Sequence, residues 1–166
     1  MNLYIMRHGP AVERGHTDYP NDNDRPLTPE GKKKVSKIAA GLRTLEITLD
    51  AIFSSPLPRA RRTAEIVAEA LHPRCKFRLT EHLSPDADPA KLLHLLQQQK
   101  GAKNLLIVGH EPDLGNLVSL LLTGQPGLAV NFKKGGFCKL SLPALTLDGH
   151  ATLEWWLPPK ILAALG

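Results

Sequence analysis

The stretch Leu3-Tyr4-Ile5-Met6-Arg7-His8-Gly9 decides how the chain is expected to fold. Its first four residues are apolar and predict a buried β-strand, with Arg7 and His8 at the strand's end. Gly9 lets the backbone turn sharply there and leaves room for a ligand to approach. The stretch therefore places an anion-binding guanidinium beside an imidazole at one strand end.

Two later segments show the same arrangement. Ser54-Ser55-Pro56-Leu57-Pro58-Arg59-Ala60 follows a second apolar run, and Val108-Gly109-His110-Glu111-Pro112 follows a third. In open α/β sheets, ligands bind beyond the carboxyl ends of the strands. Three strand ends thus supply two histidines and two arginines, which predicts a phosphate pocket containing an imidazole nucleophile.

Apolar runs alternate with helical patterns along the chain, as in a three-layer α/β domain. The expected strands are Leu3–Met6, Ala51–Ser54, Lys76–Leu79, Asn104–Val108, Phe137–Leu142 and Thr152–Trp156. The expected helices begin at Pro29 after the N-cap Thr28, near Pro56 or Pro58, at Pro89 (running to Gln99) and at Pro112. Because the last two strands flank the turn dipeptide Asp148-Gly149, they should pair antiparallel. The expected fold class is an αβα sandwich with a mixed, mostly parallel central sheet.

Composition narrows the class of partner. The chain has 166 residues, of which 42% are hydrophobic and 22% charged, so we expect one globular domain over residues 1–166. The net charge of +5 suits an anionic substrate and would also permit nucleic-acid binding. The basic residues are dispersed, however, and aromatic residues make up only 5%, so no base-stacking platform is expected and nucleic acid is not a predicted partner.

Cysteines, histidines and apolar runs argue for a cytoplasmic protein without a metal or other cofactor. Cys75 and Cys138 lack metal-ligand spacing and are expected to be reduced thiols. Four further histidines, which lie neither in the motifs nor in the loop after the third strand, lack the spacing of zinc ligands. They are His16, His72, His94 and His150. The N-terminal apolar run is too short for a signal peptide, and no run approaches the ~20 apolar residues of a membrane span.

Together, the motifs resemble the histidine phosphatase superfamily, the phosphoglycerate mutase-like enzymes, and within it the small SixA-type phosphohistidine phosphatases. The resemblance runs from Met1 to about Trp156. Its supporting segments are Arg7-His8-Gly9, Arg25-Pro26-Leu27-Thr28-Pro29-Glu30-Gly31, Ser55-Pro56 with Arg59-Ala60 and Thr63-Ala64, and Gly109-His110-Glu111-Pro112. It implies a phosphoglycerate mutase-like fold and a phosphatase that needs no cofactor.

The residue types predict individual roles in phosphoryl transfer. A neutral His8 can attack phosphorus and form a phosphohistidine intermediate, which water then hydrolyses. Arg7 and Arg59 should clamp the phosphoryl oxygens and disfavour the charged form of His8. Gly9 should allow the phosphate to approach, and His110 should donate to the phosphoryl oxygens, either neutral or as a cation. Phosphate, vanadate and tungstate are the expected inhibitory ligands.

The sequence offers several candidates for the general acid. Many members of the superfamily use a carboxylate from the loop after the third strand, where this chain has Glu81. The competing candidates are His82, Asp86, Asp88 and Asp24. A second open question is Gly135-Gly136, which could form a bulge or a close approach to the ligand.

The expected substrate is inferred from the short connection that follows the second helix. Larger branches carry a long insertion after the second helix, whereas here the connection is only about Leu71 to Cys75, so the pocket should be open enough to admit a side chain of another protein. Imidazole also leaves phosphorus more easily than an alkoxide does. Both points favour phosphohistidine on a protein, such as a phosphotransfer domain or phosphocarrier. The alternatives are a phosphatase of a small phosphorylated metabolite and a non-catalytic phosphate-binding module.

Overall fold

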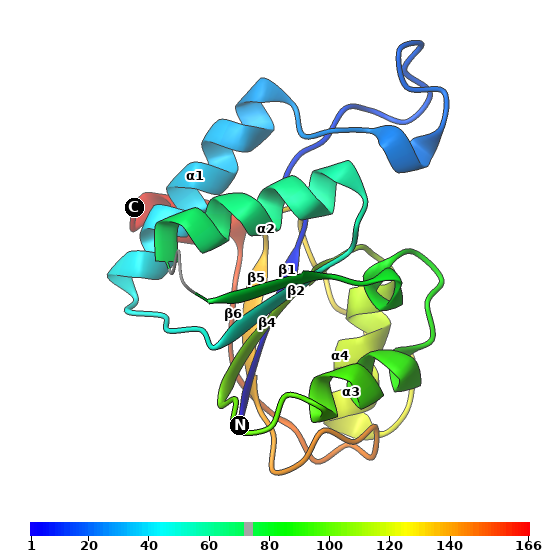
Figure 1. The fold of residues 1–166 in the computed structure, drawn as a ribbon, viewed down its shortest axis with the longest axis vertical. Coiled ribbons are helices and arrows are strands. Elements are labelled where there is room, and N and C mark those ends of the chain that lie inside the picture. The colour runs from blue at the N-terminus through cyan, green and yellow to red at the C-terminus, as the bar shows by residue number, and fades with distance from the viewer. Residues whose placement is uncertain (72–74) are drawn as a thin grey trace.

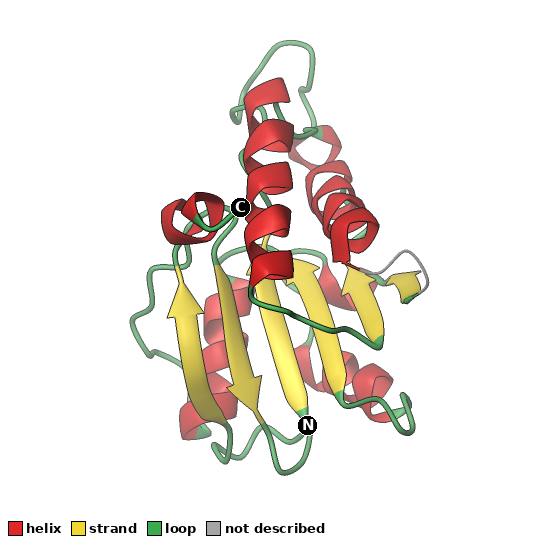
Figure 2. Cartoon of the chain, turned by 90° about the vertical axis from the view of Figure 1, so that its left-hand side faces the viewer, coloured by secondary structure: helices red, strands yellow, loops and turns green. Residues whose placement is uncertain are grey.

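Six strands form one central sheet in the computed structural model, which describes residues 1–71 and 75–166. The strands are β1 (Asn2–Arg7), β2 (Ala51–Ser54), β3 (Lys76–Leu79), β4 (Asn104–Gly109), β5 (Phe137–Ser141) and β6 (Thr152–Leu157). Their order across the sheet is β3-β2-β4-β1-β5-β6. The first four are parallel, and β5 runs antiparallel to both of its neighbours (Figure 2). The expected mixed, mostly parallel sheet is confirmed.

Helices cover both faces of the sheet, which gives the three layers. They are α1 (Pro29–Thr44), α2 (Pro58–Leu71), α3 (Pro89–Gln97), α4 (Asp113–Thr123) and α5 (Pro159–Ala164), with short 3-10 turns η1 (Asp22–Asp24) and η2 (Glu81–Leu83). Helices α1, α2 and α5 lie on one face, and α3 and α4 lie on the other (Figure 1). The short helix α5 was not expected from the sequence.

The continuous apolar runs of the central strands follow from burial on both faces. In β1, Leu3 and Ile5 point into the core beneath α3 and α4. Tyr4 and Met6 point into the core beneath α1 and α2. Because successive side chains of a strand alternate between faces, a strand that is buried on both sides must be apolar throughout. This burial fixes the end of β1 at Arg7, where the polar residues of the site begin.

Local signals place the helices close to their expected limits. The Thr28 hydroxyl accepts a hydrogen bond from the Gly31 N–H at 2.9 Å, which caps α1 directly before Pro29. The third helix ends at Gln97, two residues earlier than expected.

The connection between β5 and β6 is longer than a hairpin turn, although the two strands are antiparallel as expected. Gly149 adopts a positive φ of 81°, but it lies in a loop that folds back over the end of α4. There the Ala151 N–H donates to the Leu121 carbonyl at 3.0 Å. A contact with a helix, and not a two-residue turn, therefore sets the shape of this loop.

The connection from Leu71 to Cys75, including His72, falls largely outside the described residues. Within the ranges that are described, no helix is long and apolar enough to cross a membrane.

Candidate active site

The carboxyl ends of β1, β2 and β4 bring the predicted site residues together. The backbone N–H of His8 donates to the Gly109 carbonyl at 3.1 Å, and that of Ser55 donates to the Val108 carbonyl at 3.0 Å. The rings of His8 and His110 consequently lie 5.1 Å apart between centroids. Sheet pairing therefore sets the distance between the two imidazoles.

A cavity of about 460 Å³ opens at this edge, and we refer to it as the phosphate cavity. It is lined by Arg7, His8, Glu13, Arg14, Arg25, Arg59, Pro85, Asp86, His110, Glu111, Pro112, Asp113 and Lys134. The segment between β1 and α1, drawn in blue in Figure 1, arches past the start of α2 and supplies four of these residues, namely His8, Glu13, Arg14 and Arg25. Four of the predicted side chains, from Arg7, His8, Arg59 and His110, thus share one cavity.

The tautomer of His8 is set by the next residue along the chain. Nδ1 of His8 lies 2.7 Å from the Gly9 carbonyl oxygen. A carbonyl can only accept, so Nδ1 carries the proton and Nε2 keeps its lone pair. The ring is therefore held in the form that can attack an electrophile through Nε2.

Burial also keeps His8 uncharged. The side chain is almost inaccessible to water, and this burial lowers the pKa of His8 well below its usual value. His110, Arg59 and Arg7 lower it further, while the bond to Gly9 opposes them. Desolvation, and not the arginines alone, is the main reason that the lone pair is available.

His110 is neutral as well, which excludes the cationic form at ordinary pH. Burial first, and then Arg59 and Arg7, lower its pKa to about 3. Nε2 of His110 lies 2.9 Å from the Ser55 hydroxyl, which itself accepts from the Leu57 N–H at 3.3 Å. When the Ser55 proton is donated to Nε2, the Nδ1 atom of His110 is left as an N–H donor.

The two arginines are held through part of each guanidinium only. Nη1 of Arg7 donates to the Phe132 carbonyl at 2.6 Å, and Nη1 of Arg59 donates to the Asp22 carbonyl at 2.8 Å. Buried side-chain nitrogens without a hydrogen-bond partner in the described part of the chain are Nε of Arg7, Nε of Arg59 and Nδ1 of His110. Buried donors are ordinarily paired, so three unpaired ones around one cavity indicate a place for an anion.

A carboxylate and two further arginines belong to this cluster and were missed as site residues. Asp22 Oδ1 lies 2.9 Å from Nη2 of Arg25 and 3.0 Å from Nε of Arg14, and Asp22 Oδ2 lies 3.4 Å from Nη2 of Arg59. These contacts hold the pKa of Asp22 below its usual value, with the Arg25 hydrogen bond as the largest cause. Arg25 stood in a quoted motif, but nothing in the sequence indicated that this loop returns to α2.

The glycines act on the backbone and not on the ligand. The Gly9 N–H donates to Thr63 Oγ1 at 3.0 Å, so it is not free for a phosphate. A Cβ at Gly9 would lie 2.3 Å from Cγ2 of Val35, so close packing against α1 requires this glycine. Gly135, with φ of 82°, donates its N–H to the carbonyls of Arg7 and His8, both at 3.0 Å. Gly9 and Gly135 therefore hold the end of β1.

Glu81, like Gly9, is a predicted site residue that lies outside the lining of the phosphate cavity. It begins the turn η2, is exposed, and accepts a hydrogen bond from the Ser84 hydroxyl at 2.6 Å. Among the alternatives, Asp86 lines the phosphate cavity, whereas Asp88 caps α3 through the Ala90 N–H at 2.9 Å.

Two carboxylates that the sequence analysis did not consider also line the cavity. Burial raises the pKa of Glu111 and that of Asp113, while the hydrogen bond from the Asp86 N–H partly opposes the effect on Asp113. Burial also lowers the pKa of the neighbouring Lys134, with Arg7 and Arg25 as further causes. Over the described residues, no group of three or more His, Cys, Asp and Glu is placed to hold a metal ion.

The low pKa of His110 predicts a dependence of stability on pH. An unfolded histidine binds a proton near pH 6.5, whereas His110 in the folded protein does so only near pH 3. The free energy of unfolding should therefore fall as the pH decreases between these values, by up to about 1.4 kcal/mol per pH unit for this residue. When unfolding by urea is measured from pH 7.5 to 4.5, the free energy of unfolding should fall less steeply with decreasing pH in His110→Gln than in the wild type. With His94→Gln as the exposed control, equal slopes for wild type and His110→Gln would contradict the assignment.

Asp22 predicts an effect on anion binding. Its carboxylate neutralises part of the charge of three arginines, so Asp22→Asn should leave more positive charge for an incoming anion. We expect inorganic phosphate to inhibit turnover more tightly in Asp22→Asn than in the wild type. Weaker inhibition would instead mean that the carboxylate acts mainly by orienting Arg59.

Comparisons with known proteins identify the family of this chain. The family model described as the histidine phosphatase superfamily, branch 1, matches residues 3–84. A phosphohistidine phosphatase SixA homolog of Haemophilus influenzae is 34% identical over 73% of this chain and 77% of that protein. Phosphohistidine phosphatase SixA of Escherichia coli is 29% identical over 96% of this chain and 94% of that protein.

A solved structure of the protein histidine phosphatase SixA complexed with tungstate is also similar. It aligns with a TM-score of 0.82 and 28% identity, covering 98% of this chain and 99% of that one. The chain therefore belongs to the histidine phosphatase superfamily, and within it to the SixA-type branch.

Proposed function

We propose that this protein hydrolyses phosphohistidine on another protein, with His8 as the nucleophile. The observation that carries the proposal is the set of three buried, unpaired donors on Arg7, Arg59 and His110 around the neutral ring of His8. Three donors match the three oxygens of a transferring phosphoryl group, whose charge they would stabilise. Family membership supports the reaction class, and the tungstate in the SixA structure supports an oxyanion at such a site.

The first step forms a bond from Nε2 of His8 to phosphorus. The bond between phosphorus and the substrate imidazole breaks, and its electron pair returns to the leaving nitrogen. A substrate ring that carries a proton on its other nitrogen thereby leaves as neutral imidazole. Because Nδ1 of His8 donates to the Gly9 carbonyl, the positive charge that develops on the ring is stabilised at that proton. Arg7 and Arg59 hold the phosphoryl oxygens during the transfer.

The second step hydrolyses the phosphorylated His8. A water oxygen attacks phosphorus, the bond to Nε2 breaks, and inorganic phosphate leaves while His8 regains its lone pair. No metal ion is required by this scheme, because the cationic side chains around the phosphate cavity supply the positive charge.

A protein substrate is supported by the short chain segment after α2. Helix α2 ends at Leu71 and β3 begins at Lys76, so the sequence has no room there for the long insertion of the larger branches. The preference for an imidazole leaving group is supported by the position of Glu81, which faces Ser84 and not the cavity.

The direct test is a covalent intermediate on His8. Rapid quench of the wild type with ³²P-labelled phosphohistidine protein should trap an acid-labile, base-stable phosphoryl group. The same experiment on His8→Ala should trap none and show no turnover, because Nε2 of His110, the other imidazole in the cavity lining, is occupied by the Ser55 hydroxyl. A fully active His8→Ala protein would exclude the mechanism.

Arg59 and Arg62 form a matched pair on α2. Arg59 is 2% exposed and lines the cavity, whereas Arg62 pairs with Glu65 and Glu69 at the surface. Arg59→Ala should raise the transition-state free energy by at least ~2–4 kcal/mol, the cost of losing one preorganised donor. The kcat/KM of Arg62→Ala should stay near that of the wild type. Reversed results would show that the wrong arginine has been assigned.

The role of Glu81 stays a prediction that two variants can separate. Since its carboxylate lies outside the cavity lining, Glu81→Gln should leave kcat/KM for a phosphohistidine peptide nearly unchanged. Asp86→Asn, from the same loop but within the lining, is the comparison. Both variants should be assayed with an alkyl phosphate as well, since an alkoxide needs proton donation worth about 10²–10⁴-fold. A large loss in Glu81→Gln with both substrates would mean that Glu81 reaches the reacting group.

A further inference from the structure

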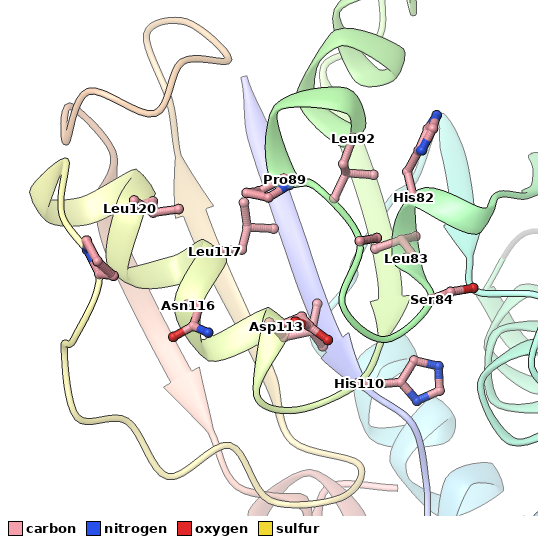
Figure 3. A pocket seen from close by; sticks show the side chains of 13 residues that line it. His82, Leu83, Ser84, Pro89, Leu92, His110, Asp113, Asn116, Leu117 and Leu120 are labelled. Atoms are coloured by element: carbon pink, nitrogen blue, oxygen red, sulfur yellow. The ribbon is translucent and has the colours of Figure 1, made fainter. Parts of the chain in front are cut away.

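A second cavity, of about 270 Å³, lies directly beside the phosphate cavity. It is enclosed between η2 and the start of α3 on one side and α4 on the other (Figure 3). Its walls are mainly aliphatic and include Leu83, Pro89, Leu92, Leu114, Leu117 and Leu120. We call it the leucine cavity. The reaction proposed above uses none of these six side chains.

The leucine cavity and the phosphate cavity share part of their walls. His110 and Asp113 line both of them. Figure 3 shows His110 at one end of the leucine cavity, with Leu117 and Leu120 further along α4. A molecule whose phosphoryl group contacts His110 therefore has the rest of its structure next to an apolar surface.

The lining of the leucine cavity favours an apolar group over a charged one. Polar side chains, including His82, Ser84 and Asn116, contribute to the lining, but most of the wall is leucine and proline. Transfer of an aliphatic or aromatic group from water to such a wall is favourable, whereas a second phosphate would lose much of its hydration and meet no arginine or lysine side chain in this lining. The volume lies just below the ~300 Å³ at which small-molecule pockets begin, and it suits one or two side chains.

We propose that the leucine cavity binds an apolar side chain of the phosphorylated substrate protein, one helical turn away from the phosphohistidine. This inference rests on the proposed function. Residues four positions apart on a helix lie about 5–6 Å apart between Cβ atoms, so they are neighbours on one helix face and can enter two cavities that share His110 and Asp113. An amphipathic helix whose apolar side chains enter a groove is a common mode of recognition.

Charge at the shared wall restricts the same helix. Asp113 of this wall lies beside Asp86 of the phosphate cavity, since the Asp86 N–H donates to Asp113 Oδ2 at 3.2 Å. An acidic residue beside the phosphohistidine would meet these carboxylates, so the substrate helix should present neutral or basic residues on that side. The specificity of the enzyme thus combines an oxyanion, an apolar side chain and the absence of nearby acidic groups.

Two synthetic peptides test the inference. Both are alanine-rich helices with one phosphohistidine; the first has leucine four residues before and four residues after it, and the second has alanine at those positions. For the wild type we expect kcat/KM to be about tenfold higher for the leucine peptide, from the burial of one leucine side chain. Equal values for the two peptides would overturn the proposal.

Asn116→Trp tests whether the difference arises in this cavity. Asn116 is exposed on α4 and lines the cavity, so an indole at this position should fill it without entering the core. The ratio of the two kcat/KM values should fall to about one. Ser36→Trp, exposed on α1 across the sheet, is the matched control and should keep the wild-type ratio. A ratio unchanged in Asn116→Trp would place the preference elsewhere and contradict the proposal.

Phosphoramidate separates this inference from the proposed function, because it has a P–N bond but no side chains. Its hydrolysis together with a leucine preference supports both proposals. Its hydrolysis without a leucine preference overturns only the leucine cavity as a docking site. Failure of the wild type to hydrolyse phosphoramidate and both peptides would overturn the proposed function itself. Faster turnover of long-chain alkyl phosphates than of either peptide would assign the cavity to a small molecule.

Discussion

The hydrogen bond between Nδ1 of His8 and the Gly9 carbonyl, 2.7 Å long, is the interaction on which the site depends. It fixes the proton on Nδ1 and leaves Nε2 with its lone pair. It can do so only because Gly9 is held in turn, by its N–H bond to Thr63 and by close packing against Val35. The carbonyl that orients His8 is therefore positioned by α1 and α2, and not by β1 alone.

The charged side chains of the phosphate cavity are also positioned by contacts between elements that are distant in the sequence. Arg7 and Arg59 end or follow strands, and the loop after β1 returns to place Asp22 among the guanidinium groups. Asp22 does not reach the three buried nitrogens that lack partners, which belong to Arg7, Arg59 and His110. The terminal nitrogens of both arginines are thus fixed by contacts, while Nε of each has no hydrogen-bond partner within the described residues.

Much of the fold could be predicted because a strand that is buried on both faces of a sheet is a continuous run of apolar residues. The runs in β1, β2 and β4 are apolar throughout, and their polar successors meet at one edge because the strands are parallel. The positions of His8, Arg59 and His110 follow from that geometry. The position of Glu81 could not be predicted in this way, because Glu81 belongs to the turn η2 and not to the end of β3. Asp22 was also missed, since a loop that returns across 37 residues to Arg59 has no periodic pattern to reveal it.

The most direct measurement is the protonation of the imidazole rings in the ligand-free protein, by long-range ¹H–¹⁵N NMR of the histidine side chains at pH 7. The resonances of His8 should show a neutral ring with the proton on Nδ1 and an unprotonated Nε2. They should not change as the pH is lowered through 6.5, because burial lowers the pKa of His8. A proton on Nε2, or a charged ring at pH 7, would contradict the assignment of His8 as the nucleophile.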